Sequence, residues 1–160
     1  MPIDLSPKPE LVTGPTSTFV YIEKIGEFMK VARPAWEELH KVALGNLEKD
    51  KMAQMMGLSL LNPDSKIPGG TYQAGFSYKS DPSKALPGAM KVRKLEGGRY
   101  AKFLLKGPYM HLAQAYPMAM QRVVDAGLKI RPAFFMEAYL NTPEDTAEAE
   151  LLTEIYIPVQ

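Results

Sequence analysis

Two hydrophobic periodicities divide the chain into predicted strands and helices. Alternating apolar and polar residues, rich in β-branched and aromatic side chains, predict strands over residues 18–25, 71–78, 99–106 and 132–141. Apolar residues spaced by three and four positions predict two helices, over residues 28–44 and 110–126. Shorter apolar runs predict strands at residues 11–12, 58–61 and 90–95. The pattern therefore predicts a mixed protein in which each helix follows a strand.

Proline and glycine residues leave some boundaries open. Pro34 either lies in the first turn of a helix that starts near Ala32 or kinks a longer helix, and Pro117 interrupts the second helical pattern. Gly45-Asn46 is a natural stop for the first helix. Residues 47–57 fit either a short helix or a loop.

The middle of the chain predicts a boundary between two halves. Residues 80–88 hold two prolines and a glycine, which is typical of a linker. We therefore expect one domain, residues 1–160, with halves at about 10–80 and 90–159. The strands at 90–95 and 99–106 flank Glu96-Gly97-Gly98, which predicts a hairpin.

The closing segment, residues 150–159, has the composition of a strand but carries a carboxylate in its middle. Period-two alternation predicts a core face made of Leu151, Thr153, Ile155, Ile157 and Val159. The opposite face is made of Leu152, Glu154, Tyr156 and Pro158. Either Glu154 lies in solvent on an edge strand, or it lines an aromatic pocket, where an ionised carboxylate needs a partner.

The order strand, helix, strand, strand occurs twice, at an offset of 81 positions. The offset pairs Ile22 with Phe103, Gly26 with Gly107, Phe28 with Tyr109, Val31 with Leu112, Leu39 with Met120, Tyr72 with Thr153 and Gln73 with Glu154. The alternative is a chance similarity between two amphipathic helices that follow strands. A true repeat predicts an α+β fold: a duplicated strand-helix-strand-strand module with pseudo-two-fold symmetry, and antiparallel sheet with two main helices on one side. A ligand pocket is then expected in the groove between the modules.

Composition narrows the function classes. The 160 residues are 46% hydrophobic and 23% charged, as in ordinary globular domains. A net charge of +1 predicts no attraction to nucleic acid or membrane, and no apolar run is long enough to span a bilayer. Cysteine is absent, which excludes disulfides and cysteine nucleophiles and fits a cytoplasmic location.

Metal and cofactor sites are not expected. His40 follows Glu37 at helical i+3 spacing, as in di-metal bundles, but the only other histidine is His111, so ligands are too few. No phosphate loop, nucleophile elbow or dinucleotide fingerprint is present. We therefore predict no cofactor.

Three segments resemble a known family. Residues 100–109 (Tyr-Ala-Lys-Phe-Leu-Leu-Lys-Gly-Pro-Tyr), with Ala115-Tyr116 in the helix that follows, resemble the second half of GyrI-like small-molecule-binding domains. These are also the effector-binding domains of AraC- and MerR-type transcription regulators. Residues 135–141 and 150–159, with the ending Thr-Glu-Ile-Tyr-Ile-Pro-Val, resemble the last two strands of that family.

The resemblance implies a stand-alone protein that senses or sequesters a hydrophobic, aromatic or cationic compound. It places the family's pocket glutamate at Glu154 and its glutamate-tyrosine pair at Glu137 and Tyr139. The remaining candidate pocket walls are aromatic: Trp36, Tyr72, Tyr109, Tyr116 and Tyr156. Trp36 and Tyr116 also fit plain core packing, because both lie on apolar helix faces.

Two other functions stay open. Some stand-alone members resemble hydrolases that open cyclopropane rings of genotoxic compounds, for which Glu154 or Glu137 is the candidate catalytic carboxylate. A module that inhibits a topoisomerase is the third class. Only residues 1–17 precede the first clear strand, whereas a helix-turn-helix needs roughly 50 residues, so we expect no direct DNA binding.

Overall fold

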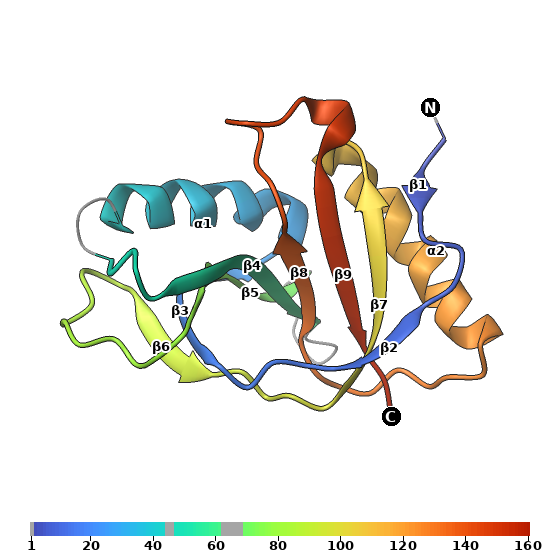
Figure 1. Cartoon of the computed structure of the whole chain (residues 1–160), viewed down its shortest axis with the longest axis horizontal. Coiled ribbons are helices and arrows are strands. Elements are labelled where there is room, and N and C mark those ends of the chain that lie inside the picture. The colour runs from blue at the N-terminus through green and yellow to red at the C-terminus, as the bar shows by residue number, and fades with distance from the viewer. Residues whose placement is uncertain (1, 44–46, 62–68) are drawn as a thin grey trace. The chain divides into compact units, whose positions relative to one another are not determined.

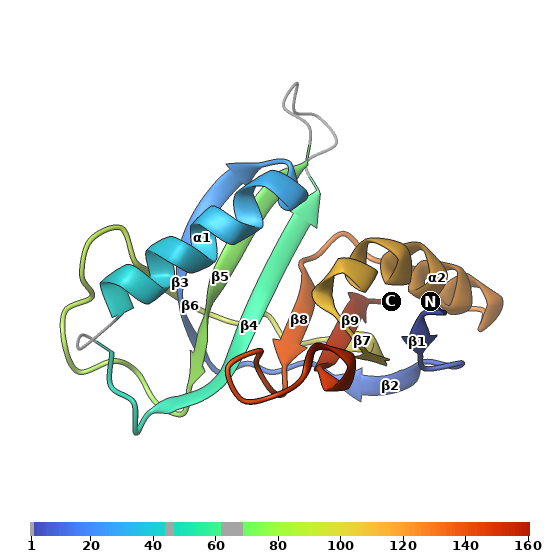
Figure 2. The same cartoon turned by 90° about the horizontal axis from the view of Figure 1, so that it is seen from above.

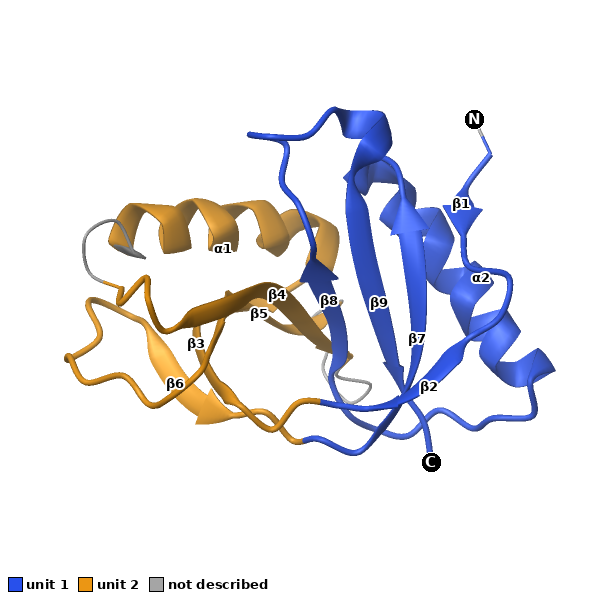
Figure 3. Ribbon diagram, in the orientation of Figure 1, with its two compact units in different colours: residues 1–14, 97–160 blue, residues 15–96 orange. Residues whose placement is uncertain are grey.

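The computed structural model describes residues 2–43, 47–61 and 69–160. The predicted helix stop at Gly45-Asn46 lies outside these residues. The chain divides into two compact units (Figure 3). Unit 1 consists of residues 1–14 and 97–160, and unit 2 of residues 15–96.

Unit 2 is a four-stranded antiparallel sheet covered on one face by a helix (Figures 1 and 2). Its elements are β3 (Thr18–Gly26), α1 (Phe28–Ala43), β4 (Met52–Leu61), β5 (Gly70–Tyr78) and β6 (Lys91–Lys94). The strand order is β4-β5-β3-β6. Alternation along β3 and β5 turns Val20, Ile22 and Ala74 toward Ala35 and Leu39 of α1, and these five side chains are buried together.

Unit 1 repeats this plan with a second helix. Its elements are β1 (Asp4–Leu5), β2 (Glu10–Thr13), β7 (Arg99–Lys106), the 3-10 turn η1 (Tyr109–His111), α2 (Leu112–Asp125), β8 (Phe135–Tyr139), the 3-10 turn η2 (Glu148–Glu150) and β9 (Leu152–Pro158). The order is β8-β9-β7, all antiparallel, and both β1 and β2 pair with the other edge of β7. Phe103 and Ile155 of the sheet are buried with Ala115, Ala119 and Val123 of α2.

The predicted core face of the last strand is confirmed. Leu151, Thr153, Ile155, Ile157 and Val159 are all almost completely buried. The α+β fold class, with antiparallel sheet and two main helices, is also confirmed.

Strand register shows how far the 81-residue repeat extends. Ile22 pairs with Ala74 across β3 and β5, and Phe103 pairs with Ile155 across β7 and β9, so both strands repeat at an offset of 81. The other neighbour of Ala74 is Gly57, and that of Ile155 is Glu137. The second strand of each module therefore repeats at 80.

The helices follow the offset of 80 as well. Ala35 and Leu39 are fully buried in α1, and Ala115 and Ala119 are fully buried in α2. The predicted pairing of Leu39 with Met120 is therefore displaced by one residue. The cause is that unit 1 has one residue fewer than unit 2 between the glycine and the buried face of its helix. Gly26 and Gly107 themselves keep the offset of 81 and share a positive φ, 148° and 132°, which only glycine adopts easily.

Two predictions are wrong. Residues 90–95 form no hairpin with residues 99–106, because β6 pairs with β3 instead. Residues 52–57 form neither helix nor loop but the first half of β4. Of the two starts left open for the first helix, the earlier one is observed: α1 begins at Phe28, and Pro34 lies inside it, where the helix lacks one N–H donor.

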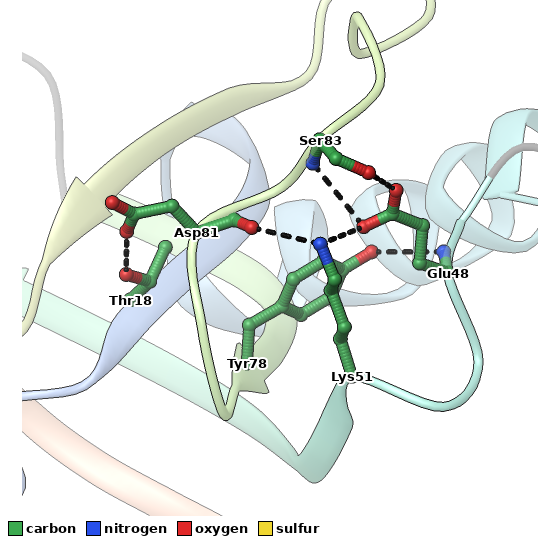
Figure 4. Close-up of polar contacts among 6 residues, drawn as sticks. All are labelled: Thr18, Glu48, Lys51, Tyr78, Asp81 and Ser83. Carbon is green, nitrogen blue, oxygen red and sulfur yellow. Dashed lines mark hydrogen bonds and ion pairs between the residues drawn. The ribbon is translucent and has the colours of Figure 1, made fainter.

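The segment predicted as a linker is tied to unit 2 (Figure 4). The Ser83 hydroxyl donates to Glu48, and Lys51 Nζ forms an ion pair with the same carboxylate at 3.0 Å. Thr18 Oγ1 donates to Asp81 Oδ1 at 2.6 Å, and Lys51 also donates to the Asp81 carbonyl. Residues 80–88 are therefore a loop held against the rest of unit 2, through the contacts of Ser83 with Glu48 and of Asp81 with Thr18 and Lys51.

Candidate ligand site

Glu137 lies in the middle of β8, on the face of the unit 1 sheet that α2 covers. Its cross-strand partner is Ile155, which is part of the core under α2. Tyr116 on α2 donates its hydroxyl to Glu137 Oε2 at 2.5 Å. Tyr139, two residues along β8, donates to Oε1, also at 2.5 Å. Both carboxylate oxygens are thus held by tyrosines, one from the helix and one from the strand.

The surroundings of Glu137 disfavour its negative charge. Burial raises the pKa of Glu137 above its ordinary value, although the two tyrosine hydrogen bonds act in the opposite direction. No lysine, arginine or histidine in residues 2–43, 47–61 and 69–160 forms an ion pair with Glu137. Among the described residues, the site therefore holds a carboxyl group that no cation neutralises.

Aromatic rings surround this carboxyl group. Tyr109 of η1 packs edge-on against Tyr139, with ring centroids 5.6 Å apart. Phe135 lies 6.3 Å from the ring of Tyr116. Burial and the nearby Glu137 charge raise the pKa of Tyr109, so its hydroxyl stays protonated. Four aromatic side chains of unit 1 thus gather around one carboxyl group.

An open apolar depression of about 550 Å³ lies along α2. It is lined by Ala113, Tyr116, Pro117, Met120, Gln121, Val124 and Ile130. Tyr116 belongs to this lining and its hydroxyl also reaches Glu137, so the depression and the carboxyl group share one side chain.

Glu154 lies on the opposite face of the same sheet. It pairs across the strands with Leu104 and Ala138, whereas Glu137 pairs with Ile155. Lys102 Nζ lies 3.2 Å from Glu154 and 3.2 Å from Glu10 of β2. Glu154 is therefore a carboxylate that already has a cation.

Tyr156 belongs to the Glu154 face and completes its surroundings. Its hydroxyl donates to Glu154 Oε1 at 3.0 Å. Burial and the Glu154 charge raise the pKa of Tyr156, which keeps the hydroxyl a donor. The predicted pocket residues of unit 1 thus form two groups on opposite faces: Tyr109, Tyr116, Glu137 and Tyr139 on one, Glu154 and Tyr156 on the other.

The predicted residues of unit 2 form a third group without a carboxylate. Trp36 Nε1 on α1 donates to Tyr72 Oη on β5 at 2.8 Å. Phe28 lies beside Tyr72, with ring centroids 6.4 Å apart. His40 Nδ1 donates to the Trp36 carbonyl, and Glu37 pairs with Arg33, so the Glu37–His40 pattern serves helix-surface contacts.

Sequence reasoning missed two features of the unit 1 site. Phe135 and Met120 were not among the candidate walls, although both are apolar residues in predicted elements. The pairing of Lys102 with Glu154 was missed as well. Alternation from the buried Phe103 puts Lys102 on the non-helical face, but only the register of β7 and β9 brings it to Glu154.

The sequence profile of the GyrI-like small-molecule-binding domain matches residues 7–160. The chain belongs to this family. No curated protein sequence matches it.

Solved structures of low sequence identity share the fold of this GyrI-like domain. EcmrR in a complex with DNA is 17% identical, with a TM-score of 0.72 over 99% of this chain, which spans only 57% of EcmrR. SAV2435 bound to tetraphenylphosphonium is 19% identical, with a TM-score of 0.69 over 96% of this chain and 94% of SAV2435. A hydrolase encoded by lin2189 from Listeria innocua is 16% identical, with a TM-score of 0.62 over 96% of this chain and 92% of the hydrolase.

Neither helix of this GyrI-like domain, in the described part of the chain, has the length and apolar character needed to cross a membrane.

Proposed function

We propose that this GyrI-like domain senses or sequesters a hydrophobic aromatic cation, and that Glu137 is the carboxylate that receives the positive charge. One observation carries the proposal: Glu137 is enclosed by aromatic side chains and has no cation partner among the described residues. Glu154, the other candidate, already pairs with Lys102, which it shares with Glu10.

The free energy of a buried charge favours this choice. An ionised carboxylate in apolar surroundings is costly unless a positive charge neutralises it. A bound cation supplies that charge, and the faces of Tyr109 and Tyr139 attract it further. At Glu154 the same ligand has to displace Lys102, and the loss of that ion pair offsets much of the binding free energy.

Apolar surface beside Glu137 suits the uncharged part of such a ligand. Met120, Val124 and Ile130 line the depression next to Tyr116. Val124 is 59% exposed, so a ligand that covers it removes apolar surface from water. SAV2435, which shares the fold, was solved with tetraphenylphosphonium, a ligand of this class.

Calorimetric titration with tetraphenylphosphonium tests the proposal. Glu137→Gln keeps the size of the side chain and removes the charge, and the tyrosine hydroxyl that faces the amide N–H can turn to accept from it. We expect it to weaken binding roughly 10- to 100-fold, or about 1.4 to 2.8 kcal/mol. Glu154→Gln is the matched control, an identical change on the opposite face, and should change the affinity less than about threefold.

The reverse result identifies the other carboxylate. If Glu154→Gln loses binding and Glu137→Gln keeps it, the ligand site is on the face of Lys102. If both variants bind tetraphenylphosphonium as well as the parent, neither carboxylate is the charge partner. The expected second wall of the pocket, Trp36 and Tyr72 of unit 2, stays a prediction that Trp36→Ala tests in the same titration.

A hydrolase acting on electrophilic cyclopropane compounds is the second candidate. The raised pKa of Glu137 suits a general acid or base near neutral pH, and Tyr116 and Tyr139 hold the group in place. Incubation of the protein with a cyclopropane electrophile tests it, and loss of the parent compound measures turnover. We expect Glu137→Gln to abolish turnover if this activity exists, and stoichiometric binding without product contradicts it. Inhibition of a topoisomerase and a cytoplasmic location stay predictions from the sequence.

A further inference from the structure

The two groups that hold Glu137 are hydroxyls, and a hydroxyl both donates and accepts hydrogen bonds. Glu154 also has a hydroxyl partner, Tyr156, but its second partner is Lys102, whose ammonium group only donates. Both partners of Glu137 are hydroxyls, and this distinguishes it from Glu154.

Hydroxyl partners fit both protonation states of Glu137 in the same positions. When the group is ionised, Tyr116 and Tyr139 each donate to one oxygen. When it is protonated, its own O–H donates to one tyrosine oxygen while the other tyrosine still donates to the remaining carboxyl oxygen. No heavy atom has to move between the two states, so a proton can be gained or lost without repacking of α2 against β8.

We propose that the empty site keeps a proton on Glu137 and that an organic cation binds in exchange for this proton. The inference rests on the proposed function and adds its regulation by pH. When the cation enters, the carboxyl O–H bond breaks and the proton passes to solvent. No covalent bond to the ligand forms, and the net charge of the site is the same before and after the exchange.

The neighbours of Glu137 in unit 1 support this exchange. In the part of the chain that the structure describes, the titratable groups that contact it or act on it are Tyr116 from α2, Tyr139 from β8 and Tyr109 from η1. All three are uncharged near neutral pH. The strand on its other side, β9, presents Ile155 and the buried Thr153. A proton is therefore the available neutralising charge, and burial raises the pKa of Glu137 in agreement.

The exchange makes affinity depend on pH in a specific way. Below the pKa of Glu137, each bound cation releases about one proton, and affinity rises about tenfold per pH unit. Above that pKa the group is already ionised and affinity levels off. A neutral aromatic ligand of the same shape releases no proton, so acid favours neutral compounds and alkali favours cations.

Proton release on binding of tetraphenylphosphonium is the decisive measurement. Calorimetry in buffers of different ionisation enthalpy counts the protons released between pH 5 and pH 8. We expect about one proton per cation below the raised pKa of Glu137 and a smaller number above it. Glu137→Gln should release none, and Glu154→Gln should behave as the parent does.

Removal of a tyrosine hydroxyl tests its hydrogen bond separately from its packing, because a change in packing alone does not shift the pH dependence of binding. Each hydroxyl lowers the pKa of Glu137. Tyr139→Phe should therefore move the pH at which affinity levels off to a higher value, while the count at low pH stays at about one proton. An unchanged pH profile in Tyr139→Phe contradicts the role of the hydroxyls.

Failure of the exchange and failure of the proposed function are distinguishable. Binding of tetraphenylphosphonium through Glu137 without proton release overturns the exchange and leaves the proposed function intact. If the parent protein does not bind tetraphenylphosphonium at any pH, the proposed function and the exchange both fail. A carbon-13 titration of the empty protein gives an independent answer: a Glu137 carboxyl that titrates in the ordinary glutamate range overturns the exchange.

Discussion

Units 1 and 2 carry the same module but place different chemistry at matching positions. Where unit 1 has Tyr116 on its helix, unit 2 has Trp36, at the offset of 80 that the buried alanines define. Where unit 1 has Glu137 on its second strand, unit 2 has Gly57, because Glu137 pairs with Ile155 as Gly57 pairs with Ala74. At this position of the repeat, unit 1 therefore has a carboxyl group and unit 2 has no side chain.

The helix residue finds a polar partner in each unit. Trp36 donates to Tyr72 on the third strand of its module, and Tyr116 donates to Glu137 on the second. At the position of Tyr72, unit 1 has Thr153, whose buried hydroxyl has no hydrogen-bond partner among the described residues. One scaffold thus supports a neutral aromatic contact in unit 2 and an acidic one in unit 1, because the scaffold depends on core positions that both units keep.

The largest expected effect tests whether the two cores are equivalent. Phe103 and Ile22 occupy the same position of the repeat, and each is 1% exposed. Phe103→Ala should lower the free energy of unfolding by roughly 3 to 5 kcal/mol, and Ile22→Ala by roughly 2 to 5 kcal/mol. Urea denaturation measures both.

Val92→Ala is the control for this pair, because Val92 is 49% exposed and its truncation should cost about 0.5 kcal/mol or less. If either core substitution lowers the free energy of unfolding by less than about 1 kcal/mol, the two cores are not equivalent.

The second test concerns the glycine before each helix. An ideal Cβ at Gly26 meets Val31 Cγ1 at 3.0 Å, and one at Gly107 meets His111 Nδ1 at 3.3 Å. Gly26→Ala and Gly107→Ala should each cost roughly 1 to 3 kcal/mol, because alanine is strained at these positive φ values. Thermal unfolding compares them with Gly127→Ala, where nothing lies within 4 Å and about 1 kcal/mol is expected. A neutral Gly26→Ala contradicts the shared turn geometry.

The third test uses pH and concerns unit 1. The folded pKa of Glu137 is raised above 4.5, so between 4.5 and that raised value the folded state holds more protons than the unfolded state. The free energy of unfolding should therefore fall as pH rises through this window. Denaturation of the parent and of Glu137→Gln at pH 4.5 to 8 measures the effect. As pH rises, the free energy of unfolding of the variant should increase relative to that of the parent. If the two free energies change in parallel with pH, the raised pKa of Glu137 is contradicted.

The smallest effect has the opposite sign and concerns unit 2. Hydrogen bonds from Ser83 and Lys51 lower the pKa of Glu48 from 4.5 to about 2. The stability that this group contributes is present above pH 4.5 and is lost as pH falls from 4.5 to 2. Ser83→Ala removes one of the hydrogen bonds drawn in Figure 4, so less stability should be lost as pH falls from 4.5 to 2. Acid titration followed by circular dichroism measures this loss. Ser80→Ala, the same change at an exposed serine of the same loop, is the matched control.

Elements that depend on local pattern were predictable from the sequence. The helix at residues 28–44 and the strands at 18–25 and 71–78 match α1, β3 and β5 closely. The buried face of β9 followed from period-two alternation alone. The repeat was detectable because strands β3 and β7 keep an offset of 81, and the same glycine precedes each helix. Periodicity and turn residues are properties of neighbouring positions, so one sequence is sufficient to show them.

Only the tertiary structure decided which strands pair and which carboxyl group has no cation partner among the described residues. The sequence favours a hairpin of residues 90–95 with β7, but β6 hydrogen-bonds to β3, more than 60 residues away in the chain, as the pairs Val20–Val92 and Tyr21–Lys91 show. Glu137 and Glu154 looked like members of one pocket, and the register of β8 and β9 turns them to opposite faces. A shift of one residue in that register would exchange the faces, and local pattern does not determine it. The long-range hydrogen bonds of the sheet therefore give Lys102 to Glu154 and leave Glu137 with two tyrosines.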